Sequence, residues 1–141
     1  RAISLANESR AELGLGRVAR ARSLCGEARG LLRNNRQNGA NLPVLREAVR
    51  VETEGSNLAR AGTLLAEFED RSRKSGWRMY VLESRCARAE IEIRSGKRPE
   101  GLQRLRTLAD EARADGIGRV ETEARNLLAR PPQAPTAPSR K

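Results

Sequence analysis

The sequence predicts an all-α protein built from repeated helix pairs, and three observations lead to this prediction. Leu and Ala supply most of the apolar residues, and aromatic residues make up only 2% of the chain. Strands favour β-branched and aromatic residues, whereas Ala, Leu, Arg and Glu favour helices. Glycines also recur at a regular spacing, and the apolar residues between them fall three or four positions apart.

The glycines form two interleaved series. Gly16, Gly55 and Gly96 make up the first series, and Gly39, Gly76 and Gly116 make up the second. Glycine is common where a helix ends in a left-handed conformation. Each of these glycines is therefore expected to end a helix. Both series share a spacing of about 40 positions, which predicts a repeated helix–turn–helix unit.

The apolar stripes locate the helices. First helices are expected over residues 3–13, 43–54 and 77–95, and the stripes of the second helices run over residues 18–32, 58–68 and 102–112. Pro43 and Pro99 suit first helical turns, where the missing N–H costs nothing. Residues 117–129 are expected to form one more helix that caps the last pair.

Small residues recur at two positions of each predicted pair. Seven residues before the turn glycines stand Ser9, Ala48 and Ala89, and five or six residues after them stand Ala21, Ala61 and Gly101. Small side chains at paired positions let two helices approach closely. Their recurrence indicates a structural repeat rather than coincidence in an Ala-rich chain.

A first helix with a small residue near its end, a turn glycine and a second helix with a small residue near its start resemble the tetratricopeptide repeat. The unit at 82–116 carries the resemblance best, through Ala89, Gly96 and Gly101. The resemblance implies a right-handed superhelix of about three antiparallel helix pairs plus a C-terminal capping helix. The longer period and the scarcity of aromatic residues depart from the family pattern, and Arg85 stands where the family prefers a bulky apolar residue.

The segment 82–96 is also similar to last repeats of multidomain bacterial signalling and regulatory proteins. Together with a start at Arg1 inside a helical pattern, this predicts the C-terminal part of a longer cytoplasmic protein. We expect one repeat domain over residues 1–129 and a disordered, Pro-rich tail over 130–141. No apolar run is long enough to cross a membrane.

The sequence contains no residues that suggest catalysis. It has no His, its two cysteines lie far apart in the chain, and its Gly-x-Gly segments lack the following Gly-Lys-Ser/Thr of a phosphate loop. The expectation is a protein that is not an enzyme and uses neither cofactor nor metal. Cys25 and Cys86 are expected to be buried, reduced thiols.

The resulting functional prediction is a protein–protein interaction scaffold that binds a protein or peptide. Charged residues of the first helices are expected to line its concave face, namely Arg46, Arg50, Glu83, Glu90 and Arg94. Trp77 and Tyr80 are expected either to anchor a partner or to pack in the core. The basic cluster Arg71, Arg73, Lys74 and Arg78 is expected either to bind an anion or to form a solvated helix end.

Two other function classes stay open. The net charge of +10 is compatible with nucleic-acid binding through an Arg-rich surface, although acidic residues interleave with the arginines. A structural or dimerisation arm is the remaining alternative, with the exposed helix at residues 1–13 as its contact surface.

Overall fold

The computed structural model describes residues 1–33 and 38–131, and within them every regular element is a helix. This part of the chain contains α1 (Ala2–Gly14), α2 (Val18–Leu32), α3 (Asn38–Glu54), α4 (Leu58–Ser75), α5 (Arg78–Arg94), α6 (Arg98–Ala114) and α7 (Gly118–Ala129). The all-α prediction is therefore confirmed. Most of the predicted disordered tail, residues 132–141, lies outside the described residues.

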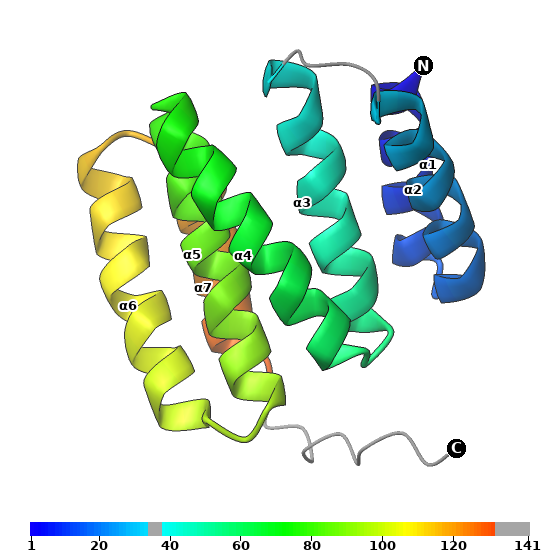
Figure 1. Cartoon of the computed structure of the whole chain (residues 1–141). Coiled ribbons are helices and arrows are strands. Elements are labelled where there is room, and N and C mark those ends of the chain that lie inside the picture. The colour runs from blue at the N-terminus through cyan, green and yellow to red at the C-terminus, as the bar shows by residue number, and fades with distance from the viewer. Residues whose placement is uncertain (34–37, 132–141) are drawn as a thin grey trace. The chain divides into compact units, whose positions relative to one another are not determined.

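The chain divides into two compact units, Arg1–Ser75 and Gly76–Lys141. In the first unit, α1 and α2 form an antiparallel pair, α3 packs on both of them, and α4 packs on α3 (Figure 1). Its core includes an apolar cluster drawn from the first three helices: Leu5, Ala6, Leu24, Ala28 and Val44. When helix pairs stack side by side, the first helix of one pair packs against the first helix of the next pair. The packing of α3 on α1 follows this order.

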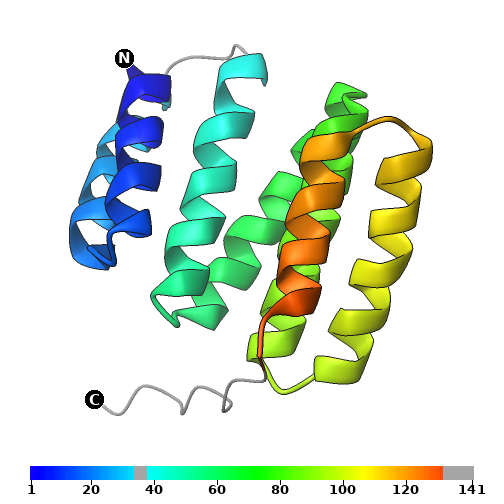
Figure 2. The ribbon, with the colours of Figure 1, turned by 180° about the vertical axis from the view of Figure 1, so that it is seen from behind.

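The second unit repeats this arrangement with three helices. Helices α5 and α6 form the pair, and α7 packs on both of them (Figure 2). Its buried apolar cluster has more residues than the cluster given above for α1 to α3. It contains Leu82, Cys86, Ala89, Leu105, Leu108, Ala109, Ala112, Val120, Ala124 and Leu127. Each of these side chains lies on the inward stripe of its helix, as the three- and four-residue spacings predict.

The helix bounds recur at one constant spacing along the chain, which we call the repeat register. The second helices begin at Val18, Leu58 and Arg98, and α5 and α7 begin at Arg78 and Gly118 with the same spacing. The first helices end at Gly14, Glu54 and Arg94, with the same spacing. Helix α7 thus begins where the first helix of a further repeat would begin.

The turns within the pairs share one hydrogen-bond pattern. The amide of Arg17 donates to the carbonyl of Glu12 at 2.9 Å, that of Asn57 to Glu52 at 2.9 Å, and that of Lys97 to Glu92 at 2.8 Å. This bond, six residues to one, is the mark of a helix end closed by a left-handed residue. Gly16 and Gly96 supply that residue with φ of 76° and 91°.

The middle turn corrects the predicted glycine register. Its left-handed residue is Ser56, with a φ of 60°, and Gly55 has no positive φ. The left-handed positions 16, 56 and 96 are therefore evenly spaced, whereas the glycines at 16, 55 and 96 are not. Gly55 serves a different need, because a Cβ there would lie 2.8 Å from Nη2 of Arg22 and 3.1 Å from Cγ1 of Val18.

Two further predictions about the start of α3 are wrong. Gly39 was expected to end a helix, but it lies in the first turn of α3, which begins at Asn38. Pro43 was expected in a first turn, but it lies inside the helix as its sixth residue. The helix tolerates Pro43 because only one backbone hydrogen bond, near the helix start, is lost. Pro99, by contrast, lies in the first turn of α6 as predicted.

The predicted close approach within the pairs is present. In the first pair, the Ser9 hydroxyl donates to the carbonyl of Ala21 at 2.7 Å. In the third pair, a Cβ on Gly101 would lie 2.8 Å from the carbonyl oxygen of Ala89. The repeat register places Val49, not Ala48, at the equivalent position of the middle pair. The close contact of Ala48 with Ala61 stays a prediction.

The Gly101→Ala substitution tests the close approach of α5 and α6. The added methyl would lie 2.6 Å from Cγ1 of Ile93 and close to the Ala89 backbone, which cannot swing away. We expect a loss of about 1–3 kcal/mol in the free energy of unfolding. Gly62→Ala is the control, because its Cβ meets nothing within 4 Å in α4. It should stabilise by roughly 0.5–1 kcal/mol; equal effects of the two changes would contradict the packing.

The Ser56→Gly substitution tests the left-handed turn. A residue with a Cβ loses roughly 1–2 kcal/mol of stability in the left-handed conformation, and glycine avoids this cost. Part of that gain is offset, because glycine loses more conformational freedom when the chain folds. We expect a net gain of about 0.5–1 kcal/mol in chemical unfolding. Ser95→Gly is the matched control, because Ser95 precedes the equivalent turn residue and has a φ of −88°. A stabilised Ser95→Gly variant with an unchanged Ser56→Gly variant would refute the assignment.

Candidate binding groove

A groove lies in the first unit, with α2 and α4 as its walls and α3 as its floor. Its cavity of about 220 Å³ is lined by Arg22, Cys25, Gly26, Arg29, Ala48, Val51, Glu52, Arg60 and Leu64. The floor and lower walls are mostly apolar, whereas three arginines surround them. The groove therefore combines an apolar base with a positively charged rim.

The α2 wall is a single helical stripe. Arg22, Cys25, Gly26 and Arg29 stand at spacings of three and four, so their side chains lie on one face of the helix. Arg22 and Arg29 are two helical turns apart, which corresponds to about 10 Å along the helix axis. Between them, Gly26 contributes no side chain and Cys25 contributes a small one.

Glu52 on α3 fixes one of the arginines. Its Oε1 accepts a hydrogen bond from Nε of Arg22 at 2.8 Å, and Gly55 leaves room for the same guanidinium. The Glu52 side chain is 10% exposed, whereas that of Arg22 is 48% exposed. The buried carboxylate thus holds a guanidinium whose outer face stays in contact with solvent. The second oxygen of Glu52 is buried and accepts no hydrogen bond from the described residues.

The remaining arginines of the rim are less constrained. Arg29 lies 3.8 Å from a carboxylate oxygen of Glu67, and neither side chain is buried. Arg60, exposed on α4, forms no ion pair with any residue that the structure describes. The groove therefore presents positive charge that its own carboxylates do not fully neutralise.

Cys25 contributes an apolar surface to the groove. Burial, with a smaller contribution from the negative charge of Glu47, raises the pKa of its thiol to about 11. Sγ lies 3.8 Å from the carbonyl oxygen of Val44, to which the thiol donates. At neutral pH the sulfur is therefore a protonated thiol, a poor nucleophile and a poor metal ligand. Neither Cys25 nor Cys86 forms a disulfide within the described residues, and both are buried, as predicted.

The residues predicted to line a concave face lie at different depths. On α3, Arg50 is half-buried, whereas the Arg46 side chain is only 11% exposed and lies 3.6 Å from the buried carboxylate of Glu47. On α5, the Arg94 guanidinium donates to Glu90 at 3.2 Å. Glu83 is only 4% exposed and faces Arg119 of α7 at 3.6 Å, so little of its surface is open to a partner.

The predicted aromatic anchor divides into an exposed and a buried ring. Trp77 is 54% exposed, whereas Tyr80 is 6% exposed. The two rings stack with centroids 5.6 Å apart and planes inclined by 24°. Trp77 is thus the ring that is accessible to a partner, and the buried ring of Tyr80 packs against it.

The predicted anion-binding cluster is distributed over the two units, and each of its members has a carboxylate partner. In α4, Arg71 pairs with Glu67 at 3.2 Å, while Arg73 and Lys74 pair with Asp70 at 2.8 and 2.9 Å. Arg78 belongs to the second unit and contacts acidic residues of α6. These ion pairs reduce the positive charge that would be available to an anion.

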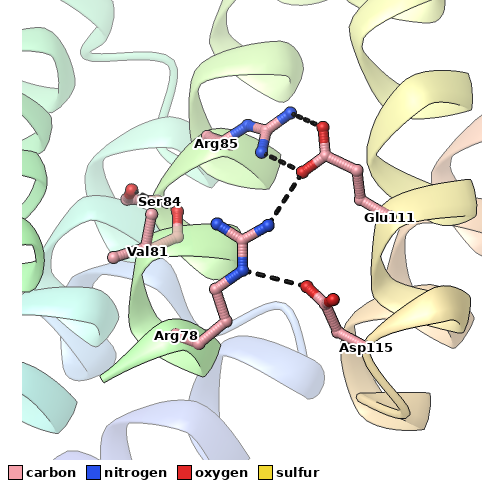
Figure 3. Close-up of polar contacts among 6 residues, drawn as sticks. All are labelled: Arg78, Val81, Ser84, Arg85, Glu111 and Asp115. Atoms are coloured by element: carbon pink, nitrogen blue, oxygen red, sulfur yellow. Dashed lines mark hydrogen bonds and ion pairs between the residues drawn. The ribbon is translucent and has the colours of Figure 1, made fainter. Parts of the chain in front are cut away.

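Arg78 belongs to a network between α5 and α6 (Figure 3). Glu111 accepts two hydrogen bonds from Arg85, at 2.6 and 3.0 Å, and one from Arg78 at 3.1 Å. Nε of Arg78 also donates to Asp115 at 2.9 Å. Arg85 therefore joins the two helices of its pair through a bidentate ion pair.

Sequence reasoning missed the groove. Its arginines are spread over Arg22, Arg29 and Arg60 and form no local cluster, so charge counting does not single them out. The spacing of Arg22 and Arg29 on one helical face was the available signal. This spacing identifies one wall of a groove only in the folded structure, where α4 packs on α3.

The network in Figure 3 predicts an acid-sensitive contribution to stability. Hydrogen bonds from Arg85 hold the pKa of Glu111 below its ordinary value of 4.5. The ion pair therefore stabilises the fold fully above the ordinary pKa, and this stabilisation is lost as the pH falls through the lowered pKa of Glu111. Because both side chains are partly exposed, Glu111→Gln should cost only about 1 kcal/mol at pH 7.

Denaturant unfolding of Glu111→Gln and the parent at several pH values measures this contribution. The difference between them should shrink towards zero as the pH falls below the lowered pKa of Glu111. Asp110→Asn is the control, because the Asp110 side chain is 82% exposed on the same helix. A Glu111→Gln deficit that persists unchanged in acid would contradict the ion-pair explanation.

Comparison with known proteins gives no relative for this chain. No protein-family model matches it, and no curated protein or solved structure is significantly similar. Among residues 1–33 and 38–131, no helix has the length and apolar character needed to cross a membrane.

Proposed function

We propose that the chain is a helical-repeat interaction module, similar to tetratricopeptide repeats, that binds a protein partner. The observation that carries the proposal is the repeat register shared by the helix starts, helix ends and turns. A chain of stacked pairs uses one side of each helix for its core and leaves long faces for a partner. On the same proposal, the module belongs to a larger cytoplasmic signalling or regulatory protein.

The size of the groove favours a protein partner over a small molecule. Pockets that enclose a whole small ligand usually have volumes of about 300–1,000 Å³. The groove of about 220 Å³ is smaller, and it suits a side chain of a larger partner.

The distribution of charge favours a protein over a nucleic acid. Binding to nucleic acid draws its affinity from Lys and Arg that are free to replace phosphate counterions. Many basic side chains here contact carboxylates of their own unit, for example Arg10 with Glu47 and Arg104 with Glu92, at 3.1 and 2.6 Å. Acidic side chains therefore interrupt the basic surface, although 28 basic against 18 acidic residues leave an excess charge of +10.

The test is a binding measurement with a partner purified after cross-linked capture. Reversal of two first-helix charges, Arg50→Glu with Glu90→Arg, should weaken the reconstituted complex about 10-fold or more, or roughly 1.4 kcal/mol. The control reverses two exposed second-helix charges, Arg20→Glu with Glu100→Arg, and should change affinity less than about 2-fold. Equal losses would reject the first-helix face.

Two further measurements separate the function classes. Titration with duplex and single-stranded DNA and RNA at several salt concentrations should show weak binding only. Sub-micromolar affinity with a steep salt dependence would replace the proposal with nucleic-acid binding. Sedimentation should show a monomer; a stable dimer with no captured partner would favour the dimerisation arm.

A further inference from the structure

The charge and shape of the groove suggest what occupies it. We propose that the groove of α2, α3 and α4 binds an acidic segment of a partner protein, with Glu or Asp carboxylates at Arg22, Arg29 and Arg60. The inference rests on the proposed function, because it names the part of a protein partner that is recognised. It concerns a different surface from the charged first-helix residues.

Electrostatic complementarity identifies the occupant as acidic. Glu52 holds Arg22 through a bond to Nε, while the Arg22 side chain stays 48% exposed. Arg60 has no ion pair within the described part of the chain, and Arg29 pairs with Glu67 at 3.8 Å. Guanidinium groups bind carboxylates through paired hydrogen bonds. Three of them around one cavity favour a ligand with negative charge.

The two arginines of the α2 wall lie well apart along the helix. Arg22 and Arg29 are separated by two helical turns, about 10 Å along the axis. A segment with several acidic side chains can pair with both of them and with Arg60 at once. The cavity of about 220 Å³ is too small to enclose such a segment, so the segment would lie along the groove and insert side chains.

The lining between the arginines predicts apolar side chains in the same segment. Ala48, Val51 and Leu64 line the cavity, and Cys25 adds an uncharged thiol. Apolar surface that is removed from water by a partner stabilises the complex in proportion to its area. The expected segment therefore alternates acidic and apolar residues.

Gly26 allows the groove to be filled without damage to the fold. A Cβ at Gly26 meets nothing within 4 Å, and the same holds for Gly30 on the same helix. Gly30, however, does not line the cavity. Both Gly26→Met and Gly30→Met should increase helix propensity, and only the first places a side chain in the groove.

The experiment uses the full 141-residue chain and a short fluorescent peptide of alternating Glu and Leu, blocked at both ends. Fluorescence anisotropy should show saturable binding that weakens with salt. Gly26→Met should raise the Kd about 10-fold or more, and Arg60→Gln about 5-fold, since charge-assisted hydrogen bonds contribute most. Gly30→Met should leave the Kd within about 2-fold.

A peptide in which Gln replaces Glu should bind at least about 10-fold more weakly. Equal affinity of the two peptides, equal effects of Gly26→Met and Gly30→Met, or no binding of the Glu peptide at millimolar concentration would overturn the inference. If the peptide fails while a purified protein partner still binds, only the groove assignment falls. If neither binds, the proposed function falls with it.

Discussion

The close approach of the two helices within each pair is the constraint on which the rest of the structure depends. It occurs where one residue of the first helix meets one residue of the second, as Ser9 meets Ala21 and Ala89 meets Gly101. At Gly101 the second helix lies against the backbone of Ala89, so an additional methyl group there has no space. Once this contact is made, the inward stripes of both helices face a common core.

The repeat register is the consequence of repeating this contact. The turn between the two helices must have a fixed length, and one left-handed residue with its six-to-one hydrogen bond closes the first helix each time. Because the contact and the turn recur together, helix starts and ends recur with them. Surface residues are then free to differ between repeats. The ion pairs and the groove are formed by residues that do differ in this way.

The same geometry explains how charged residues enter the structure. Leu5 and Leu45 are buried, whereas the residue at the equivalent position of the third pair, Arg85, is charged. Its bidentate contact with Glu111 takes the place of apolar packing between α5 and α6. Glu52 is likewise accommodated near the core because Arg22 reaches it from α2. In both cases the methylene groups of the arginine contribute apolar contacts, and its guanidinium group pairs with a carboxylate.

Much of the fold could be predicted from the sequence, because helix-forming composition, apolar stripes and glycine turns all indicate the same elements. Segment α2 was predicted with the bounds Val18–Leu32 that it has in the structure. The errors came from treating every glycine alike. Gly55 lies close to the guanidinium of Arg22, and Ser56 takes the left-handed conformation that the pattern assigned to its neighbour. The candidate site could not be predicted in the same way, because Arg22, Glu52 and Arg60 come from three helices that only tertiary packing brings to one cavity.

The register of the middle helix pair offers the most direct test of this account. In a carbon-edited NOE spectrum, methyl protons of Val49 and Ala61 should show a strong cross-peak, as should Hα of Gly101 with the methyl of Ala89. Contacts from Ala61 to Ala48 in place of Val49 would mean that Gly55 sets the turn. The repeat register, and the close helix contact that produces it, would then be contradicted.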